Sequence, residues 1–157
     1  MGIRKIRIEG DEILRKTAKP VTEMNLRTKA LIRDMFDTMY KAEGVGLAAP
    51  QVGILKRLFV IDCSADRSRA MVFINPEILE TEGAQTGEEG CLSVPGKHAT
   101  VTRAMKVTVR ALNEEMEEFT LTLEGLEARC VLHENDHLDG VLYVDKAESP
   151  VVDNEED

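Results

Sequence analysis

The chain has 157 residues, of which 43% are hydrophobic and 31% are charged, a composition that fits one soluble domain and excludes wholesale disorder. The net charge of −9 excludes the basic surface with which proteins bind nucleic acid directly. No run approaches the ~18 apolar residues of a membrane span, and the first residues lack the apolar core of a signal peptide. Because three cysteines are an odd number without framework spacing, we expect reduced thiols and a cytoplasmic location.

Apolar residues at helical spacing predict two helices in the first third of the chain. A short helix is expected over residues 11–18, with Asp11 as its N-cap. A longer helix is expected over residues 25–43, and Gly44 is expected to end it. We interpret the apolar stripe of the longer helix as core packing rather than as a cofactor site.

Shorter apolar runs predict strands. Residues 58–61 and 71–74 are typical of buried strands, whereas residues 106–112 and 118–124 alternate apolar and polar side chains like a hairpin with one solvent-exposed face. After Gly125 the pattern becomes helical again. The pattern therefore predicts an α+β fold, in which small mixed or antiparallel sheets pack around a central C-terminal helix.

The end of the chain has a different composition from the rest. Residues 145–157 hold six acidic residues and one lysine, a net charge of −5. Such a charge density without apolar periodicity favours a solvated, disordered segment. We expect a single catalytic domain over residues 1–147 and an acidic, disordered tail over residues 148–157.

The most informative motif is His133-Glu134-Asn135-Asp136-His137, on the last predicted helix. Residues four apart lie on one helical face, so both imidazoles can reach a single ion. Glu134, between them, can handle the protons of a metal-bound water. The pattern therefore indicates a hydrolytic metal site. Two surface histidines that meet by accident are the less favoured interpretation.

The third ligand has to come from an earlier part of the chain. One metallopeptidase group places another histidine six residues after the second, but that position is Tyr143 here. Cys130 shares the helical face, yet it lies seven residues from His137, about 10 Å along the axis at 1.5 Å per residue. Bonds of roughly 2.0–2.3 Å to one ion cannot easily span that distance. Cys63 is expected to pack at a strand end, so Cys91, in a turn-rich segment, is the predicted third ligand.

Three segments resemble the three signature motifs of the peptide deformylases: residues 44–51 (GVGLAAPQ), 89–93 (EGCLS) and 133–137 (HENDH). They occur in the order of that family and at similar spacing, and the likeness extends to about Asp145. The resemblance implies a metal-dependent hydrolase of the same α+β fold. Such an enzyme removes the N-formyl group from the initiator methionine of nascent bacterial or organellar polypeptides and releases formate.

The resemblance also implies roles for individual residues. Glu134 would be the general base, while the Gln51 side chain and the Leu92 backbone N–H would stabilise the oxyanion. An extended N-formylmethionyl peptide would contact the main chain of Gly46, and its methionine would enter an apolar pocket lined by Val45, Leu126 and Cys130. The ion would be Fe²⁺, with Zn²⁺ or Ni²⁺ able to replace it. Glu89 is either a hydrogen-bond acceptor for a ligand histidine or a surface charge, and both interpretations stay open.

The chain departs from the family pattern in three places. Leu132 stands where the family commonly has glutamine, and His98 stands where it often has arginine. Many bacterial members continue into a basic C-terminal helix that docks on the ribosome, whereas the last residues here are acidic. We therefore do not expect ribosome docking by that route.

Two functions of other classes stay open. One is a metallopeptidase that cuts ordinary peptide bonds; Tyr143 and the segment around Cys91 argue against it. The other is a deformylase-like protein that binds formyl-peptides or metal without turnover. The presence of Glu134, Gln51 and the three predicted ligands argues against this second alternative.

Overall fold

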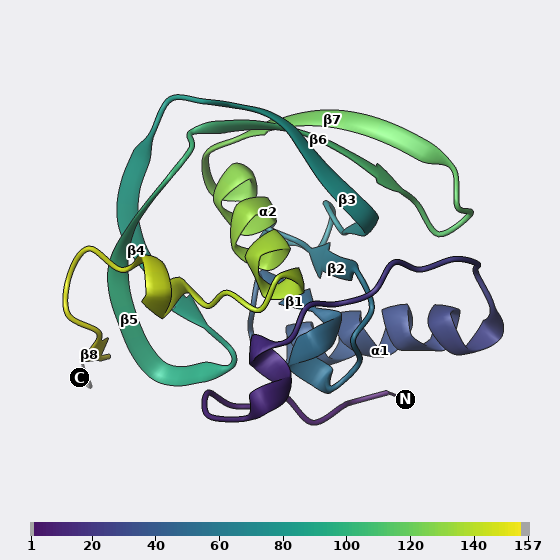
Figure 1. Ribbon diagram of the computed structural model, residues 1–157, viewed down its shortest axis with the longest axis horizontal. Helices are drawn as coiled ribbons and strands as arrows, with labels where there is room; N and C mark the ends of the chain where they lie inside the picture. Colours follow the sequence, from purple (N-terminus) through teal and green to yellow (C-terminus); the bar gives the residue numbers. More distant parts are fainter. Residues whose placement is uncertain (1, 155–157) are drawn as a thin grey trace.

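The computed structural model describes residues 2–154, which form two antiparallel sheets and a central helix (Figure 1). In chain order the elements are η1 (Glu12–Arg15), α1 (Leu26–Lys41), β1 (Gly46–Ala48), η2 (Ala49–Val52), β2 (Leu58–Ile61), β3 (Met71–Glu82), β4 (Gln85–Cys91), β5 (Val94–Arg103), β6 (Lys106–Leu112), β7 (Glu118–Glu124), α2 (Gly125–Leu138), η3 (Tyr143–Lys146) and β8 (Val152–Asp153). The predicted α+β arrangement around a C-terminal helix is present. No helix in this part of the chain is long and apolar enough to cross a membrane.

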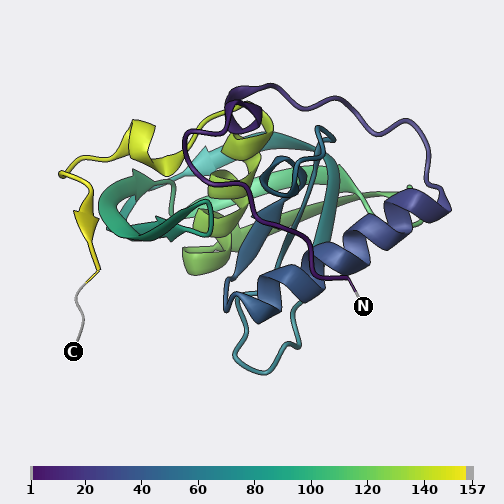
Figure 2. The same ribbon diagram turned by 90° about the horizontal axis from the view of Figure 1, so that it is seen from below.

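The larger sheet has the strand order β1-β2-β3-β6-β7, and its strands β1 and β2 are covered on both faces. Successive side chains of a strand point to opposite faces. In β2, Phe59 and Ile61 therefore pack in one core with α2, while Leu58 and Val60 pack in a second core with α1. Figure 2 shows α1 and α2 on opposite sides of these strands. Burial on both faces explains why β2 is a continuous apolar run.

The smaller sheet, β4-β5-β8, lies across α2 from the larger one (Figure 1). Strand β4 was not predicted, because Gln85–Cys91 contains no apolar residue before its final cysteine and therefore no apolar–polar alternation. Its partner β5 was not predicted either. The predicted strands 58–61, 106–112 and 118–124 are confirmed with these bounds. The strand expected at 71–74 continues to Glu82.

The two predicted N-terminal helices are present with altered ends. Residues 12–15 form only one turn of 3-10 helix, although Asp11 caps it as expected. The prediction that Gly44 ends α1 is wrong by one residue, since Glu43 adopts the left-handed conformation with φ of 60°. The N–H groups of Glu43 and Gly44 bond the carbonyls of Tyr40 and Met39, which is a Schellman motif. A Cβ at Gly44 would lie 2.7 Å from the Leu92 side chain, which would then have to shift.

The segment after η3 lies along β5 and supplies β8, an outer strand of the smaller sheet. The Glu148 N–H bonds the Thr100 carbonyl at 2.7 Å, and Val152–Asp153 pairs with Lys97 and His98 of β5. We expected disorder over 148–157, whereas residues 148–154 follow this edge because β5 offers free backbone groups there. Residues 155–157 lie outside the described part of the chain.

Candidate active site and metal centre

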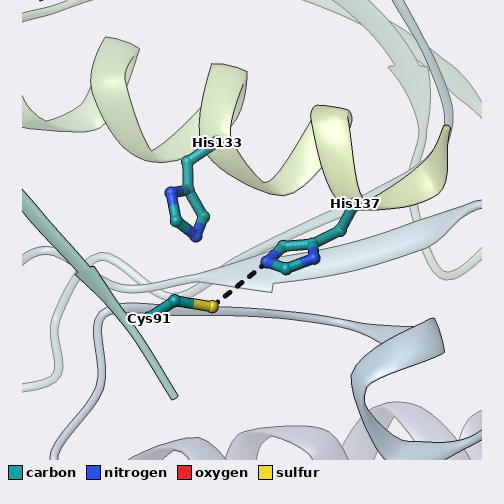
Figure 3. Close-up of side chains that lie close together, drawn as sticks. All are labelled: Cys91, His133 and His137. Carbon is teal, nitrogen blue, oxygen red and sulfur yellow. Dashed lines mark hydrogen bonds between the residues drawn. The ribbon is translucent and has the colours of Figure 1, made fainter. Parts of the chain in front are cut away.

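The three predicted metal ligands converge beside α2. His133 and His137 are one turn apart on the buried face of the helix, and Cys91 is the last residue of β4 (Figure 3). One nitrogen of each histidine and the cysteine sulfur all lie within 4.8 Å of one another. The Cys91 Sγ is 3.3 Å from His137 Nε2. Packing of the β4–β5 hairpin against α2 therefore brings together residues that are 46 positions apart.

The donor set fits a divalent metal ion. One thiol and two imidazoles, three protein ligands in total, are typical of catalytic rather than structural zinc-type sites. Burial and the neighbouring charge of His133 hold the pKa of His137 well below its usual value, so its imidazole is neutral, the form that binds metals. His137 Nδ1 has no hydrogen-bond partner among residues 2–154. The ligand-side atoms, His137 Nε2 and Cys91 Sγ, contact each other and can turn to a shared cation.

Glu89 orients His133. Glu89 lies two residues before Cys91 in β4, and its carboxylate is 2.9 Å from His133 Nδ1. A carboxylate only accepts, so Nδ1 carries the proton and Nε2 is left to bind an ion. Glu89 is buried, with an exposed fraction of 6%, and the interpretation of it as a surface charge is wrong.

Two arginines hold Glu89 in its ionised form. Arg103 donates to both carboxylate oxygens at 2.9 Å, and Arg129 also donates to one of them. Burial alone would raise the pKa of Glu89, but the hydrogen bonds from His133 and Arg103 outweigh it and hold the pKa well below its usual value. These arginines, Arg103 in β5 and Arg129 in α2, were not predicted, because an arginine carries no sequence signal of a distant partner.

Replacing Arg103 with methionine is expected to lower the free energy of unfolding by about 3 kcal/mol, because the change leaves a buried carboxylate short of a partner. Because Glu89 keeps its ion pair with Arg129, we expect a loss of stability at the low end of the range for broken buried ion pairs. Urea denaturation of zinc-loaded protein measures it. The matched control is Arg110→Met, which removes an ion pair between Arg110 and Glu77 whose side chains are 41% and 60% exposed. The control should lose less than ~1 kcal/mol, and equal losses would contradict the prediction.

Glu134 is buried next to the ligands. Its Oε2 lies 4.0 Å from His133 Nε2, and its Oε1 has no hydrogen-bond partner within residues 2–154. Burial raises the pKa of Glu134 to about 7, although the nearby His133 acts in the opposite direction. A Cβ at Gly46 would lie 2.5 Å from Oε2, so glycine there makes room for this carboxylate. Glu134 is thus a carboxylate with an open acceptor atom and a pKa suited to proton transfer near neutral pH.

Gln51 also contacts Cys91. It belongs to η2, and its Oε1 accepts the N–H of Ala48 at 2.9 Å. Its Nε2 lies 3.0 Å from Ser93 Oγ and 3.5 Å from Cys91 Sγ. The side-chain amide is therefore oriented by the protein before any substrate is bound. Ser93, which completes this orientation, was not predicted.

A cavity of about 590 Å³ opens beside these groups. The predicted substrate residues and the three predicted catalytic residues line it: Val45, Gly46, Gln51, Leu92, Leu126, Cys130 and Glu134. Val45 and Leu126 are 41% and 51% exposed and form its apolar mouth. Ile6, Lys97 and Asn154 also line the cavity and were not predicted. His137, the second of the two proposed ligands on α2, is not among the residues that line it.

The comparisons with known proteins agree with this geometry. The sequence pattern of the polypeptide deformylase family matches residues 3–152. The chain belongs to this family. It is 55% identical to peptide deformylase 1 of Clostridium perfringens over 92% of this chain and 98% of that protein. Crystal structures of peptide deformylases from Legionella pneumophila and Thermotoga maritima superpose with a TM-score of 0.90 each, at 53% and 44% identity. They cover 93% and 96% of this chain, and 86% and 100% of those chains.

Membership of the polypeptide deformylase family confirms the prediction that the three motifs supported. The chain is an enzyme, a metal-dependent hydrolase that removes the N-formyl group of formylmethionyl peptides. The α+β fold is also confirmed by the two superpositions. Nothing in these comparisons favours a metallopeptidase or a binding protein without turnover.

Proposed function

We propose that Cys91, His133 and His137 hold the catalytic ion and that Glu134 is the general base of formyl-group hydrolysis. The observation that carries the proposal is the convergence of the three ligand atoms within 4.8 Å at a cavity that also contains the buried Glu134. A divalent ion held by these three residues would lower the pKa of a bound water molecule from 15.7 towards about 7, which would make that water a nucleophile at neutral pH.

Glu134 moves the protons of the reaction. Its unpartnered Oε1 can accept a proton from the attacking water, and the same carboxyl group can then donate it to the leaving amine. A pKa of about 7 suits both steps, because the group exchanges protons readily in either direction at neutral pH. The absence of a side chain at Gly46 leaves room for the carboxylate next to the ligands.

Gln51 and the backbone N–H of Leu92 stabilise the oxyanion. The two N–H groups of Gln51 Nε2 donate to Ser93 Oγ at 3.0 Å and to Cys91 Sγ at 3.5 Å, and we infer that the longer bond, to Cys91, is exchanged for one to the developing negative charge. Preorganised donors of this kind contribute about 2.7–4 kcal/mol each to transition-state stabilisation. The bond from Ala48 N–H to Gln51 Oε1 supports this role, because it holds the amide in place.

The substrate is an N-formylmethionyl nascent chain. We infer that its backbone runs along Gly46 and that the methionine side chain enters the part of the cavity lined by Val45, Leu126 and Cys130. The apolar character of these three residues supports a methionine pocket. We further propose that residues 1–147 form one catalytic domain and that the enzyme acts in the cytoplasm, where formylated nascent chains are made.

One assay tests this function against both alternatives. Nickel- or iron-loaded protein is incubated with formyl-Met-Ala-Ser and with unblocked Met-Ala-Ser, and formate and peptide fragments are measured. We expect formate from the first peptide and no fragments from either. Fragments of Met-Ala-Ser would indicate a metallopeptidase, and binding of the formyl-peptide without formate would indicate a protein without turnover.

We propose Fe²⁺ as the working ion, with Zn²⁺ or Ni²⁺ able to replace it. A thiolate ligand next to an open, water-accessible position is exposed to oxidation. Oxidation of the cysteine to a sulfinate is irreversible and removes it as a ligand. We therefore expect iron-loaded enzyme to lose activity in air within hours, with two oxygen atoms added at Cys91. Nickel-loaded enzyme should keep its activity over the same period. Mass spectrometry of tryptic peptides follows the change, and stable iron activity with unmodified Cys91 would contradict the expectation.

A further inference from the structure

Two cysteines outside the proposed ligand set touch each other next to the substrate cavity. Cys63 directly follows Asp62 at the end of β2 and is half-buried, whereas Cys130 lies in α2 and is buried. Their Sγ atoms are 3.2 Å apart, although the residues are 67 positions apart in the chain. Cys130 is also part of the cavity wall. Packing of α2 on β2 therefore creates a pair of adjacent thiols at the site.

We propose that Cys63 and Cys130 form an oxidative modification site, in which hydrogen peroxide links them in a reversible disulfide at the wall of the substrate cavity. A disulfide bond is 2.03–2.05 Å long, so the sulfur atoms have to approach by about 1.2 Å. Cys63 lies just beyond the last residue of β2, in the connection to β3, so its backbone is not held by strand pairing. Side-chain rotation and a small backbone shift can supply the approach.

Cys63 is the thiol that meets the oxidant. It is the more exposed of the two, and the contact with Cys130 lowers the pKa of the Cys63 thiol, while the same contact and burial raise the pKa of Cys130. The thiolate, not the thiol, is the nucleophile in such reactions. An accessible thiolate next to a second, resolving cysteine is the arrangement found at reversible redox sites.

The reaction has two steps. The Cys63 thiolate attacks one oxygen of hydrogen peroxide, the O–O bond breaks, and the departing oxygen takes a proton and leaves as water, which gives a sulfenic acid. The Cys130 sulfur then attacks the sulfenic sulfur, the S–O bond breaks, and the hydroxyl leaves as a second water with the Cys130 proton. The two thiols lose two electrons, and the peroxide is reduced to two waters.

The disulfide is expected to disturb substrate positioning, a consequence that rests on the proposed function. Cys130 lies three residues before His133, within one turn of α2. Drawing that turn towards β2 changes the cavity wall and shifts His133 relative to Cys91. Misplacement of reacting groups by about 1 Å can cost as much as 10²-fold in rate. We therefore expect kcat/KM to fall by at least ~10-fold on oxidation.

The test uses zinc-loaded enzyme, in which Cys91 is protected as a ligand. The enzyme is treated with hydrogen peroxide, free thiols are alkylated, and a non-reducing digest is analysed by mass spectrometry. We expect a cross-linked peptide pair containing Cys63 and Cys130, an intact mass lower by two hydrogens, and recovery of both thiols and activity after reduction. The matched control is Cys63→Ser, which should keep its activity and form no cross-link.

Three results would overturn the proposal. Both thiols could remain fully alkylatable while Cys91 oxidises, or Cys63 could stop at a sulfenic or sulfinic acid without a cross-link. The cross-link could also form with kcat/KM unchanged, which would remove its coupling to the cavity. The cross-link is detected by mass, whereas the proposed catalytic roles are tested by the activity of the untreated enzyme. Absence of the cross-link can therefore be distinguished from a failure of those roles.

Discussion

Replacing Glu134 with glutamine is expected to lower kcat/KM by at least ~10²-fold, the low end for the loss of a general acid–base group. Glutamine has the same shape and cannot accept a proton at neutral pH. It also removes a buried carboxyl group that has no partner for one oxygen, so the fold should be unaffected or slightly more stable. The rate of formate release from formyl-Met-Ala-Ser is the measurement.

Two controls separate chemistry from damage to the site. Metal content must stay stoichiometric in Glu134→Gln, because the three proposed ligands are intact. The exposed Glu88→Gln in β4 removes a charge of the same type from the cavity rim and should change kcat/KM by less than ~3-fold, since a surface substitution away from the reacting groups has little effect. Near-normal turnover in a metal-replete Glu134→Gln would exclude Glu134 from the mechanism.

Replacing Cys91 with alanine is expected to abolish stoichiometric metal binding and, with it, deformylation. The site has three protein ligands, and loss of one leaves two histidines of a single helix, too few for tight binding. The measurement is the metal-to-protein ratio by atomic spectroscopy after gel filtration of protein loaded with Zn²⁺ or Ni²⁺. The melting temperature should also cease to depend on added metal.

Cys130→Ala is the matched control for this experiment. Both cysteines lie next to the cavity, but the Cys130 sulfur contacts Cys63 rather than the two histidines. We expect the Cys130→Ala protein to bind one ion per chain and to show a raised KM, because one apolar wall of the methionine pocket is smaller. Metal loss from Cys130→Ala together with retention in Cys91→Ala would reverse the ligand assignment.

The catalytic helix was predictable because its information is local. The spacing of His133, Glu134 and His137 on one face follows from helix geometry alone, and so does the conclusion that Cys130 lies too far along the axis to join them. The β6–β7 hairpin was predictable for the same reason, since alternation over seven residues reports which face is buried. In both elements the residues that define the pattern are near neighbours in sequence.

The selection of Cys91 needed elimination and resemblance, because its own segment carries no strand pattern. β4 is polar, with Gly87 and Gly90 in a run that lacks apolar alternation. Its conformation is set by pairing with β5, which buries Glu89 and directs Glu89 and Cys91 to the same side, towards α2. The tail over residues 148–154 is a similar case: acidic composition favoured disorder, while pairing with the free edge of β5 gave it a place.

The sequence by itself determined the metal motif, its helix, the proton-transferring glutamate and the family. Tertiary structure alone decided how that helix is surrounded: Arg103 and Arg129 on Glu89, Ser93 on Gln51, and Cys63 against Cys130. These contacts join residues between 14 and 67 positions apart. Their partners depend on which elements pair or pack together, and periodicity within one element contains no information about which distant side chain will face it.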